Sequence, residues 1–189
     1  MNNTILLNNL YSIQKNPGKL DELISLIKAE IMDENNITKK GTKARTKAAL
    51  AFLKANKYRE SLKHTSIQTI DGTDYQCFTN SFVGFFLKES LPLPTVEMKD
   101  HVNMSYVYPY NLKPFELDIN DVLNAVKLKN DVYHLYDDIG VSSKYVKIVT
   151  QVLGSNDLEV YTNGELGKRG LLVFKHGEDV AIVAPVRIH

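Results

Sequence analysis

Basic side chains are concentrated in one stretch of the chain, residues 36–66. Nine bases less one acid, Glu60, give this stretch a net charge of +8, whereas the whole 189-residue chain carries +1 and the remainder therefore totals −7. Such asymmetry is typical of a surface that faces a polyanion, because ammonium and guanidinium groups neutralise phosphate. A lysine-rich helix with a merely solvated side has the same composition, so both interpretations stay open. The bases are Lys39, Lys40, Lys43, Arg45, Lys47, Lys54, Lys57, Arg59 and Lys63.

Few groups are arranged for catalysis. The sequence has no glycine-rich nucleotide-binding loop, no His-Glu-x-x-His motif and no Cys-x-x-Cys pair, and its five histidines are scattered. The adjacent acids Asp33-Glu34, Asp137-Asp138 and Glu178-Asp179 are predicted to lie in turns or at helix ends. We therefore expect a protein that is not an enzyme and that binds no metal or cofactor.

Cys77 is the only cysteine, so the chain cannot form an internal disulfide, and a reducing, cytoplasmic setting is expected. It lies in an alternating stretch, Tyr75–Phe78, which predicts a small buried residue. No apolar run reaches the roughly 18 residues that a membrane span needs. The first residues lack a basic segment followed by a long apolar one, so no signal peptide is predicted.

Apolar periodicity predicts a helical hairpin over residues 1–35. Residues 4–14 have a helical stripe, Asn16-Pro17-Gly18 interrupts it, and residues 19–33 resume it. The second stripe consists of Leu20, Leu23, Ile24, Ile27 and Ile31. This apolar face must pack against the rest of the chain or against a second copy, so a homo-oligomer is one expectation.

A third helix, predicted over residues 42–56, carries many of the bases on one side and Ala48, Leu50, Ala51, Phe52 and Leu53 on the other. From His64 onward the pattern changes to strands, with a hairpin turn at Asp71-Gly72. Two more helices are predicted, one starting near residue 117 with Asp118 or Asn120 as its cap, and one over 142–153 ended by Gly154. Strands are predicted over 64–70, 75–79, 82–88, 131–136, 157–162, 170–175 and 179–188, with one short strand in an extended loop over 95–115.

Two stretches resemble a known family. The helix, three strands and tail of residues 142–188 end in Ala184-Pro185-Val186-Arg187-Ile188, and they are similar to the last part of the bacterial DNA polymerase III β sliding clamp, which ends Met-Pro-x-Arg-Leu. Residues 49–87 look like the opening of a clamp domain, with Arg59-Glu60-Ser61-Leu62 in place of Arg-Pro-x-Leu. Residues 78–84 stand where the family has Ala-Thr-Asp-Gly-Tyr-Arg-Leu, but Asn80 replaces the Asp and Phe82-Val83 the Tyr-Arg pair.

The resemblance implies an α+β chain with one clamp-like domain, residues 42–189, built from two helix-plus-strands halves. In the family, helices line a basic surface that faces double-stranded DNA without reading its sequence. The residues that would contact DNA here are Lys39, Lys40, Lys43, Arg45, Lys47, Lys54, Lys57, Arg59, Lys144 and Lys147.

The family's tail also lines a groove that captures short peptides from polymerases and repair proteins. Here Val183, Pro185, Val186 and Arg187 would line such a groove, or they would simply complete the core. Because the family's last strand lies inside the sheet, the resemblance further implies that the helices bury Val180, Ile182, Val183 and Val186.

Two functions follow as hypotheses. The first is a DNA-associated accessory protein of phage or mobile-element replication or recombination, since a single-domain clamp-like chain rich in Asn, Lys and Ile is typical of such elements in low-GC bacteria. The second is a protein-interaction module that binds or inhibits a host replication or defence protein, with the aromatic stretch 104–115 as its contact surface.

Overall fold

The computed structural model describes residues 19–34, 41–56 and 59–188, and it confirms a mixture of helices and antiparallel strands. The stripe predicted over 4–14, and with it the first half of the helical hairpin, lies outside the described residues. The helices are α2 (Lys19–Glu34), α3 (Thr42–Lys54), α4 (Ile119–Lys127) and α5 (Ser143–Leu153). Three short 3₁₀ helices are η1 (Glu60–Leu62), η2 (Met98–Asp100) and η3 (Ser105–Val107).

The described strands form two sheets. The larger has the order β1-β2-β3-β9-β8-β7-β4 and the smaller the order β10-β6-β5. The bounds are β1 (Ser66–Ile70), β2 (Thr73–Thr79), β3 (Val83–Leu87), β4 (Lys113–Pro114), β5 (Val132–Tyr136), β6 (Ile139–Ser142), β7 (Glu159–Thr162), β8 (Leu172–His176), β9 (Asp179–Val183) and β10 (Val186–Arg187).

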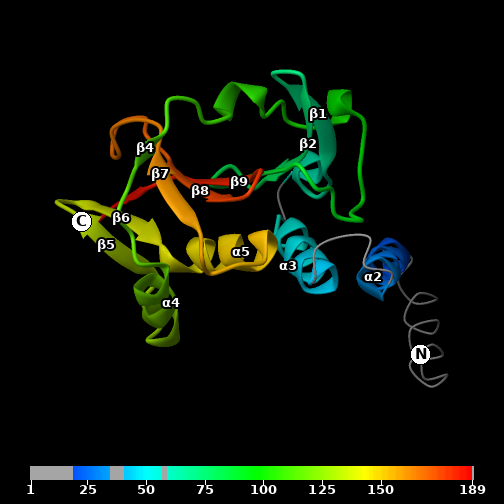
Figure 1. Cartoon of the computed structure of the whole chain (residues 1–189), viewed down its shortest axis with the longest axis horizontal. Coiled ribbons are helices and arrows are strands. Elements are labelled where there is room, and N and C mark those ends of the chain that lie inside the picture. Colours follow the sequence, from blue (N-terminus) through cyan, green and yellow to red (C-terminus); the bar gives the residue numbers. More distant parts are fainter. Residues whose placement is uncertain (1–18, 35–40, 57–58, 189) are drawn as a thin grey trace.

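The large sheet joins two similar halves. In each half a helix precedes three consecutive antiparallel strands: α3 with β1–β3, and α5 with β7–β9. The last strands of the halves, β3 and β9, pair antiparallel with Val83 opposite Val183. The two halves therefore meet at the centre of one continuous sheet, and their helices α3 and α5 pack side by side (Figure 1).

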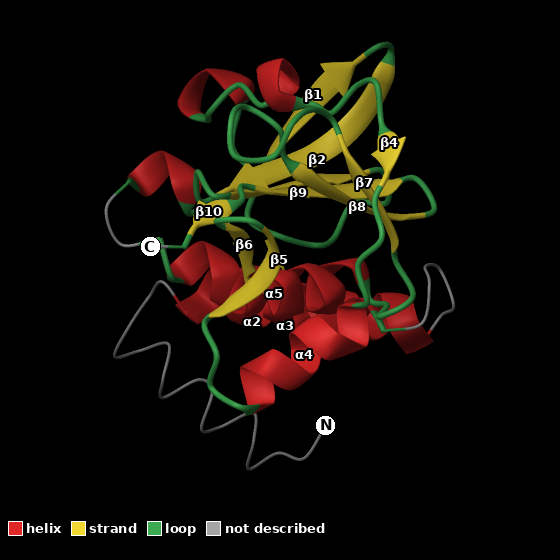
Figure 2. Ribbon diagram, turned by 90° about the vertical axis from the view of Figure 1, so that its left-hand side faces the viewer, coloured by secondary structure: helices red, strands yellow, loops and turns green. Residues whose placement is uncertain are grey.

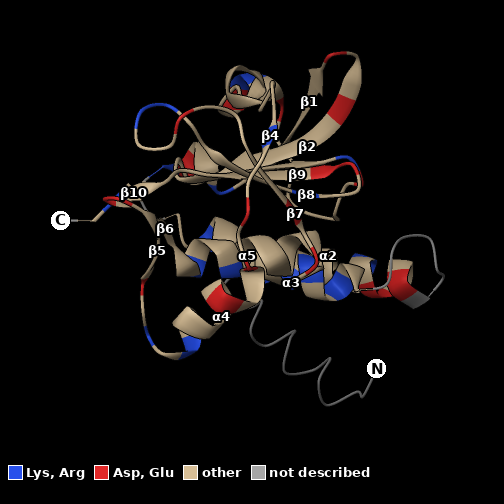
Figure 3. Ribbon diagram, turned by 60° about the vertical axis from the view of Figure 1, so that its left-hand side comes forward, with Lys and Arg blue, Asp and Glu red and all other residues tan. Residues whose placement is uncertain are grey.

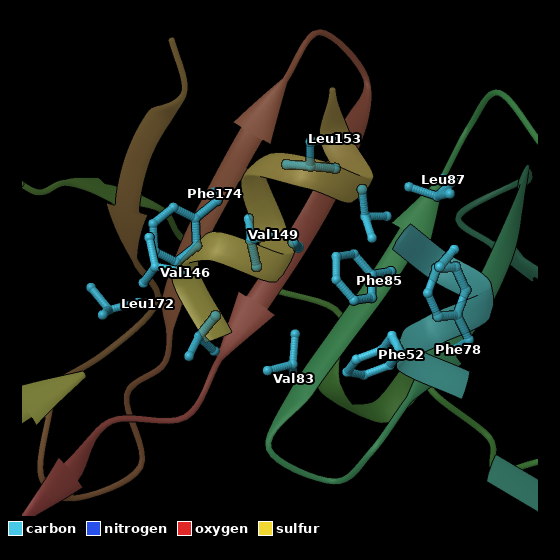
Figure 4. Packing of buried hydrophobic residues seen from close by; sticks show 14 of the residues in the cluster. Phe52, Phe78, Val83, Phe85, Leu87, Val146, Val149, Leu153, Leu172 and Phe174 are labelled. Atoms are coloured by element: carbon cyan, nitrogen blue, oxygen red, sulfur yellow. The ribbon is translucent and has the colours of Figure 1, made fainter. Parts of the chain in front are cut away.

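The helices form a layer on one face of the sheet (Figures 1 and 2). Beneath them lies the main core, in which Phe52 of α3 packs edge-on against Phe78 and Phe85 of the sheet, while α5 contributes Val146 and Val149 (Figure 4). The opposite face has a smaller core that includes Phe86, Val173 and Ile182, over which the segment 88–112 places the buried side chain of Met104. The sheet is thus covered on both faces, by helices on one and by a long connection on the other.

Turn and cap residues lie where their chemistry predicts. Asp71 and Gly72 both have positive φ, as a two-residue hairpin loop between paired Ile70 and Thr73 requires. Asp118 caps α4, because its carboxylate accepts the backbone N–H of Asn120 at 2.8 Å. Gly154 ends α5 in the left-handed conformation with φ 77°.

The tail differs from expectation. The predicted strand over 179–188 breaks after Val183, and β10 leaves the large sheet to pair with β6 of the small one, with Val186 opposite Gly140. Val180 and Ile182 are buried, but by the smaller core on the face away from the helices. Val183 lies on the helix side, and Val186 is only half-buried. The alternation of apolar residues indicated burial, but it did not reveal that the two faces have different covers.

We therefore expect deletion of residues 184–189 to weaken the fold without abolishing it. The deletion removes the bond from Ala184 N–H to Phe82 O at 2.8 Å and the whole of β10, but leaves β9 intact. The thermal midpoint should fall by about 5 °C, because a chain of this length shows such a shift when its free energy of unfolding drops by about 2 kcal/mol. Unfolding should stay cooperative. Calorimetry would contradict this if the midpoint were unchanged or the cooperative transition vanished.

Candidate nucleic-acid interface

The exposed side of α3 carries Lys43, Lys47 and Lys54. The side chains of Lys43, Arg45 and Lys47, in the first turns of α3, do not all point the same way, because each helical residue is rotated by about 100° from the one before it. Lys43 and Lys47, four residues apart, lie on one face and point to solvent, whereas Arg45 is buried. The charge of this helix is therefore divided between its surface and its interior.

The neighbouring helix α5 also carries basic residues (Figure 3). These are Lys144 and Lys147, both exposed. Lys144 forms an ion pair with Asp131 at 2.6 Å. Lys147 and Lys47 form no ion pair with any described residue. On α3 and α5, the two central helices, these are thus the ammonium groups that no carboxylate of a described residue contacts.

A groove of about 710 Å³ runs between α3 and the C-terminal end of α5. On the α3 side three alanines keep it open, since the methyl group is too short to fill the space between the helices. Ala51 is exposed in this groove, so its predicted place on the apolar side was wrong, whereas Ala48 is half-buried and packs against the main core as expected. The lining residues are Ala44, Lys47, Ala48, Ala51, Thr150, Gln151, Gly154, Ser155 and Asn156.

Helix α2 lies beside α3 and supplies acids to its bases. Glu30 pairs with Lys43 at 2.6 Å, and Glu22 pairs with Lys54. All four side chains are about a third exposed or more, so each pair stabilises the fold by no more than about 1 kcal/mol. These contacts are weak enough to exchange for other anions, and they lower the positive potential above α3.

Asp33, at the end of α2, caps α3 from outside that helix. Its two carboxylate oxygens accept the backbone N–H groups of Thr42 and Lys43, each at 2.9 Å. Desolvation raises the pKa of Asp33, but these two hydrogen bonds and the charge of Lys43 outweigh it, so the pKa lies below its ordinary value. The residue at the N-cap position itself, Gly41, has no side chain to do this.

The packing of α2 differs from expectation. Leu20, Ile24 and Ile31 of the predicted apolar stripe are exposed, whereas Ser25 and Ala29 are buried. The fully buried positions of α2 are therefore small residues and not the members of the predicted stripe.

Arg45 was predicted to contact DNA, and the structure places it in the interior. Its side chain is 4% exposed, and its Nη2 donates to Asp179 Oδ2 at 2.7 Å. Its Nε donates to the carbonyl oxygen of Val152 in α5 at 2.8 Å. The other Asp179 oxygen accepts the backbone N–H of Lys88 at 2.9 Å. Arg45 thus joins α3 to α5 and β9, and through Asp179 to the backbone that follows β3. Its charge is balanced by Asp179 in the interior and is not available to a ligand at the surface.

Of the remaining residues predicted to contact DNA, the structure describes one. Arg59 is exposed just before η1. Lys39, Lys40 and Lys57 lie outside the described residues.

The predicted peptide groove is not assembled by its four residues. Val183 is fully buried in the main core. Pro185 and Val186 are half-buried, and Arg187 is exposed with its Nη2 donating to the carbonyl oxygen of Gly167 at 3.3 Å. The correction for Val183 follows from β9, whose side chains alternate between the helix layer and the opposite core.

No catalytic centre stands out in the described part of the chain. Burial raises the pKa of the Cys77 thiol to about 12, so this side chain is not a nucleophile at neutral pH, in line with its predicted burial. Among the described residues no group of three or more His, Cys, Asp or Glu side chains is arranged to hold a metal ion. The described helices include none that is both long and apolar enough to cross a membrane.

Comparison of the chain with protein-family models, with curated proteins and with solved structures gives no match.

Replacing Arg45 by Ala should lower the free energy of unfolding by about 3–5 kcal/mol, because it leaves Asp179 buried without its counter-charge. Lys47→Ala, two residues further on the same helix but exposed, is the matched control and should change it by less than about 0.5 kcal/mol. Urea unfolding measures both. Equal effects of the two variants would contradict a structural role for Arg45.

The cap on α3 should be pH-dependent. Asp33→Ala should cost about 1 kcal/mol at pH 7. Because the folded pKa of Asp33 is lowered, its contribution is complete above the ordinary carboxyl pKa and is lost as pH falls through the folded value. The stability gap between wild type and variant should therefore close in acid. Asp138→Ala, which removes an exposed acid from a turn, is the control. A stability gap between wild type and Asp33→Ala that is the same at pH 2 and pH 7 would contradict the cap.

Proposed function

We propose that this chain is a non-enzymatic, DNA-associated accessory protein that binds double-stranded DNA through its helical layer without sequence specificity. The observation that carries the proposal is one exposed lysine on each of the two central helices, Lys47 of α3 and Lys147 of α5, that forms no ion pair with a described residue. Lys43, Lys54 and Lys144 surround them and become available when phosphates replace their exposed acidic partners.

The arrangement of the chain supports a clamp-like fold for this task. One clamp domain, as the resemblance implies it, consists of two helix-plus-strands halves with both helices on the DNA side. Here α3 and α5 lie side by side on one face of a sheet whose halves meet at β3 and β9 (Figure 1). Point charges on flexible lysine stems suit phosphate contacts, which fix position but carry no sequence information. We further propose a cytoplasmic protein of a phage or mobile element that acts alone or as a homo-oligomer.

A second function is favoured by a separate observation. The segment 98–110, on the face away from the helices, leaves Met98, Val102, Tyr106, Val107 and Tyr110 exposed, with Tyr106 86% accessible. Apolar side chains gathered in this way suit a protein partner, such as a host replication or defence protein. This surface and the helical layer lie on opposite faces of the sheet, so either function can be tested without disturbing the other.

The test is fluorescence anisotropy of a labelled DNA duplex at several salt concentrations. The double variant Lys47→Ala/Lys147→Ala should weaken binding and reduce the slope of log K against log salt by about 2, because each lost phosphate contact releases about one fewer counterion. The control is Lys99→Ala/Lys168→Ala, which removes the same charge from lysines that are each 73% exposed and lie outside the helical layer. No binding at low salt, or equal slopes for the two variants, would refute the helical layer as the DNA surface.

A further inference from the structure

Phe82 is an exposed aromatic side chain at the tip of the β2–β3 hairpin. Its side chain is 57% accessible, although Phe78, Phe85 and Phe86 on the flanking strands are fully buried. The ring stacks on Tyr145, with centroids 6.2 Å apart and planes within 17°. An exposed ring of this kind forfeits the free energy that its burial would contribute.

The turn that presents Phe82 is strained. Ser81 has φ 78°, a conformation that a serine rarely adopts and that glycine would adopt without cost. Such outliers persist only where the surroundings enforce them, and they are concentrated at functional positions.

Side-chain hydrogen bonds enforce this conformation. The amide oxygen of Asn80 accepts the backbone N–H groups of Phe82 at 3.0 Å and Val83 at 2.8 Å. The hydroxyl of Thr79 accepts the N–H of Ser81 at 3.0 Å and donates to Val83 O at 2.7 Å. The carbonyl of Phe82 accepts the N–H of Ala184 at 2.8 Å. The position of the ring is therefore fixed before any ligand arrives.

The elements that hold the ring pair also carry basic residues. Tyr145 lies in the first turn of α5, the helix that also carries the exposed Lys144 and Lys147. The amide nitrogen of Asn56 donates to Leu62 O at 2.8 Å and to Thr79 O at 3.4 Å, which ties the segment that begins with Arg59 to the base of the hairpin. Arg59 is exposed and forms no ion pair with a described residue.

We propose that Phe82, backed by Tyr145, is a stacking site for an unpaired nucleobase at the rim of the helical layer. An exposed ring stacked on a helix with exposed lysines matches single-stranded nucleic acid, in which a π-face and a phosphate alternate along the chain. Duplex DNA keeps its bases stacked inside, so it reaches the lysines but not the ring. This inference rests on the proposed function, and it adds a preference for DNA with an unpaired segment, such as a primer–template junction.

The experiment uses the full chain with Phe82→Trp. The natural sequence contains no tryptophan, so the emission of this variant reports on position 82 alone. Titration with a 16-nucleotide oligo(dT) should quench that emission, whereas a blunt duplex of 16 base pairs should leave it nearly unchanged. In anisotropy, Phe82→Ala should weaken oligo(dT) binding about tenfold and leave duplex binding unaltered.

Two controls keep the result interpretable. Tyr106→Ala removes a more exposed aromatic ring from the opposite face and should not change either affinity. Phe82→Leu keeps an apolar side chain without a π-face, so it should lose oligo(dT) affinity like Phe82→Ala while the far-UV circular dichroism of the fold is retained.

Each outcome separates the two proposals. Salt-sensitive duplex binding without tryptophan quenching, or equal affinity of wild type and Phe82→Ala for oligo(dT), overturns the stacking site and leaves the proposed function standing. Equal quenching by the blunt duplex overturns the preference for unpaired bases. No binding of either DNA at low salt overturns both proposals.

Discussion

The buried ion pair between Arg45 and Asp179 is the contact on which the arrangement of this chain depends. It joins α3 of the first half to β9 and α5 of the second, while Asp179 also accepts from the backbone that follows β3. A guanidinium, whose donors are fixed in one plane, binds the Val152 carbonyl of α5 and the Asp179 carboxylate of β9 at once, a geometry that the point charge of lysine does not reproduce. Even the end of α5 is adapted to it, because a Cβ at Gly154 would lie 3.0 Å from Arg45 Cδ. Side chains that fix the two halves in this way determine where the surface lysines stand relative to one another.

The order of most elements could be predicted from the sequence, because local rules determine it. Apolar periodicity located α2, α3 and α5. Turn residues located element ends, as Asp71-Gly72 did for the turn between β1 and β2 and Gly154 did for the end of α5. Errors arose where tertiary contacts decide the outcome. Two such errors concern the pairing of β10 with a second sheet and the buried face of α2. The sequence of a segment does not specify which strand it will pair with or which elements will cover it.

The candidate site was less predictable than the fold. Arg45 was counted as a surface base because its residue type suggests exposure. Its position in the helix indicates burial instead, because Arg45 lies four residues before Ala49 and eight before Leu53, on the same buried face. Asp179 was taken for a turn residue, and no local pattern links it to a helix 134 positions away. Glu22, Glu30, Asp33 and Phe82 were missed for the same reason, since their partners or their exposure are set by the folded chain.

The +8 of residues 36–66 therefore overstates the potential that reaches solvent. Within the described part of this stretch, Arg45 is neutralised in the core, and Lys43 and Lys54 are held by Glu30 and Glu22. DNA that met only Lys47 and Lys147 would give a salt slope near −2, whereas displacement of α2's acids and of Asp131 would recruit three more lysines and bring the slope towards about −4.5. The slope thus measures whether phosphates replace these carboxylates. A value near the upper limit would mean that the acidic residues of α2 compete with DNA for the same ammonium groups.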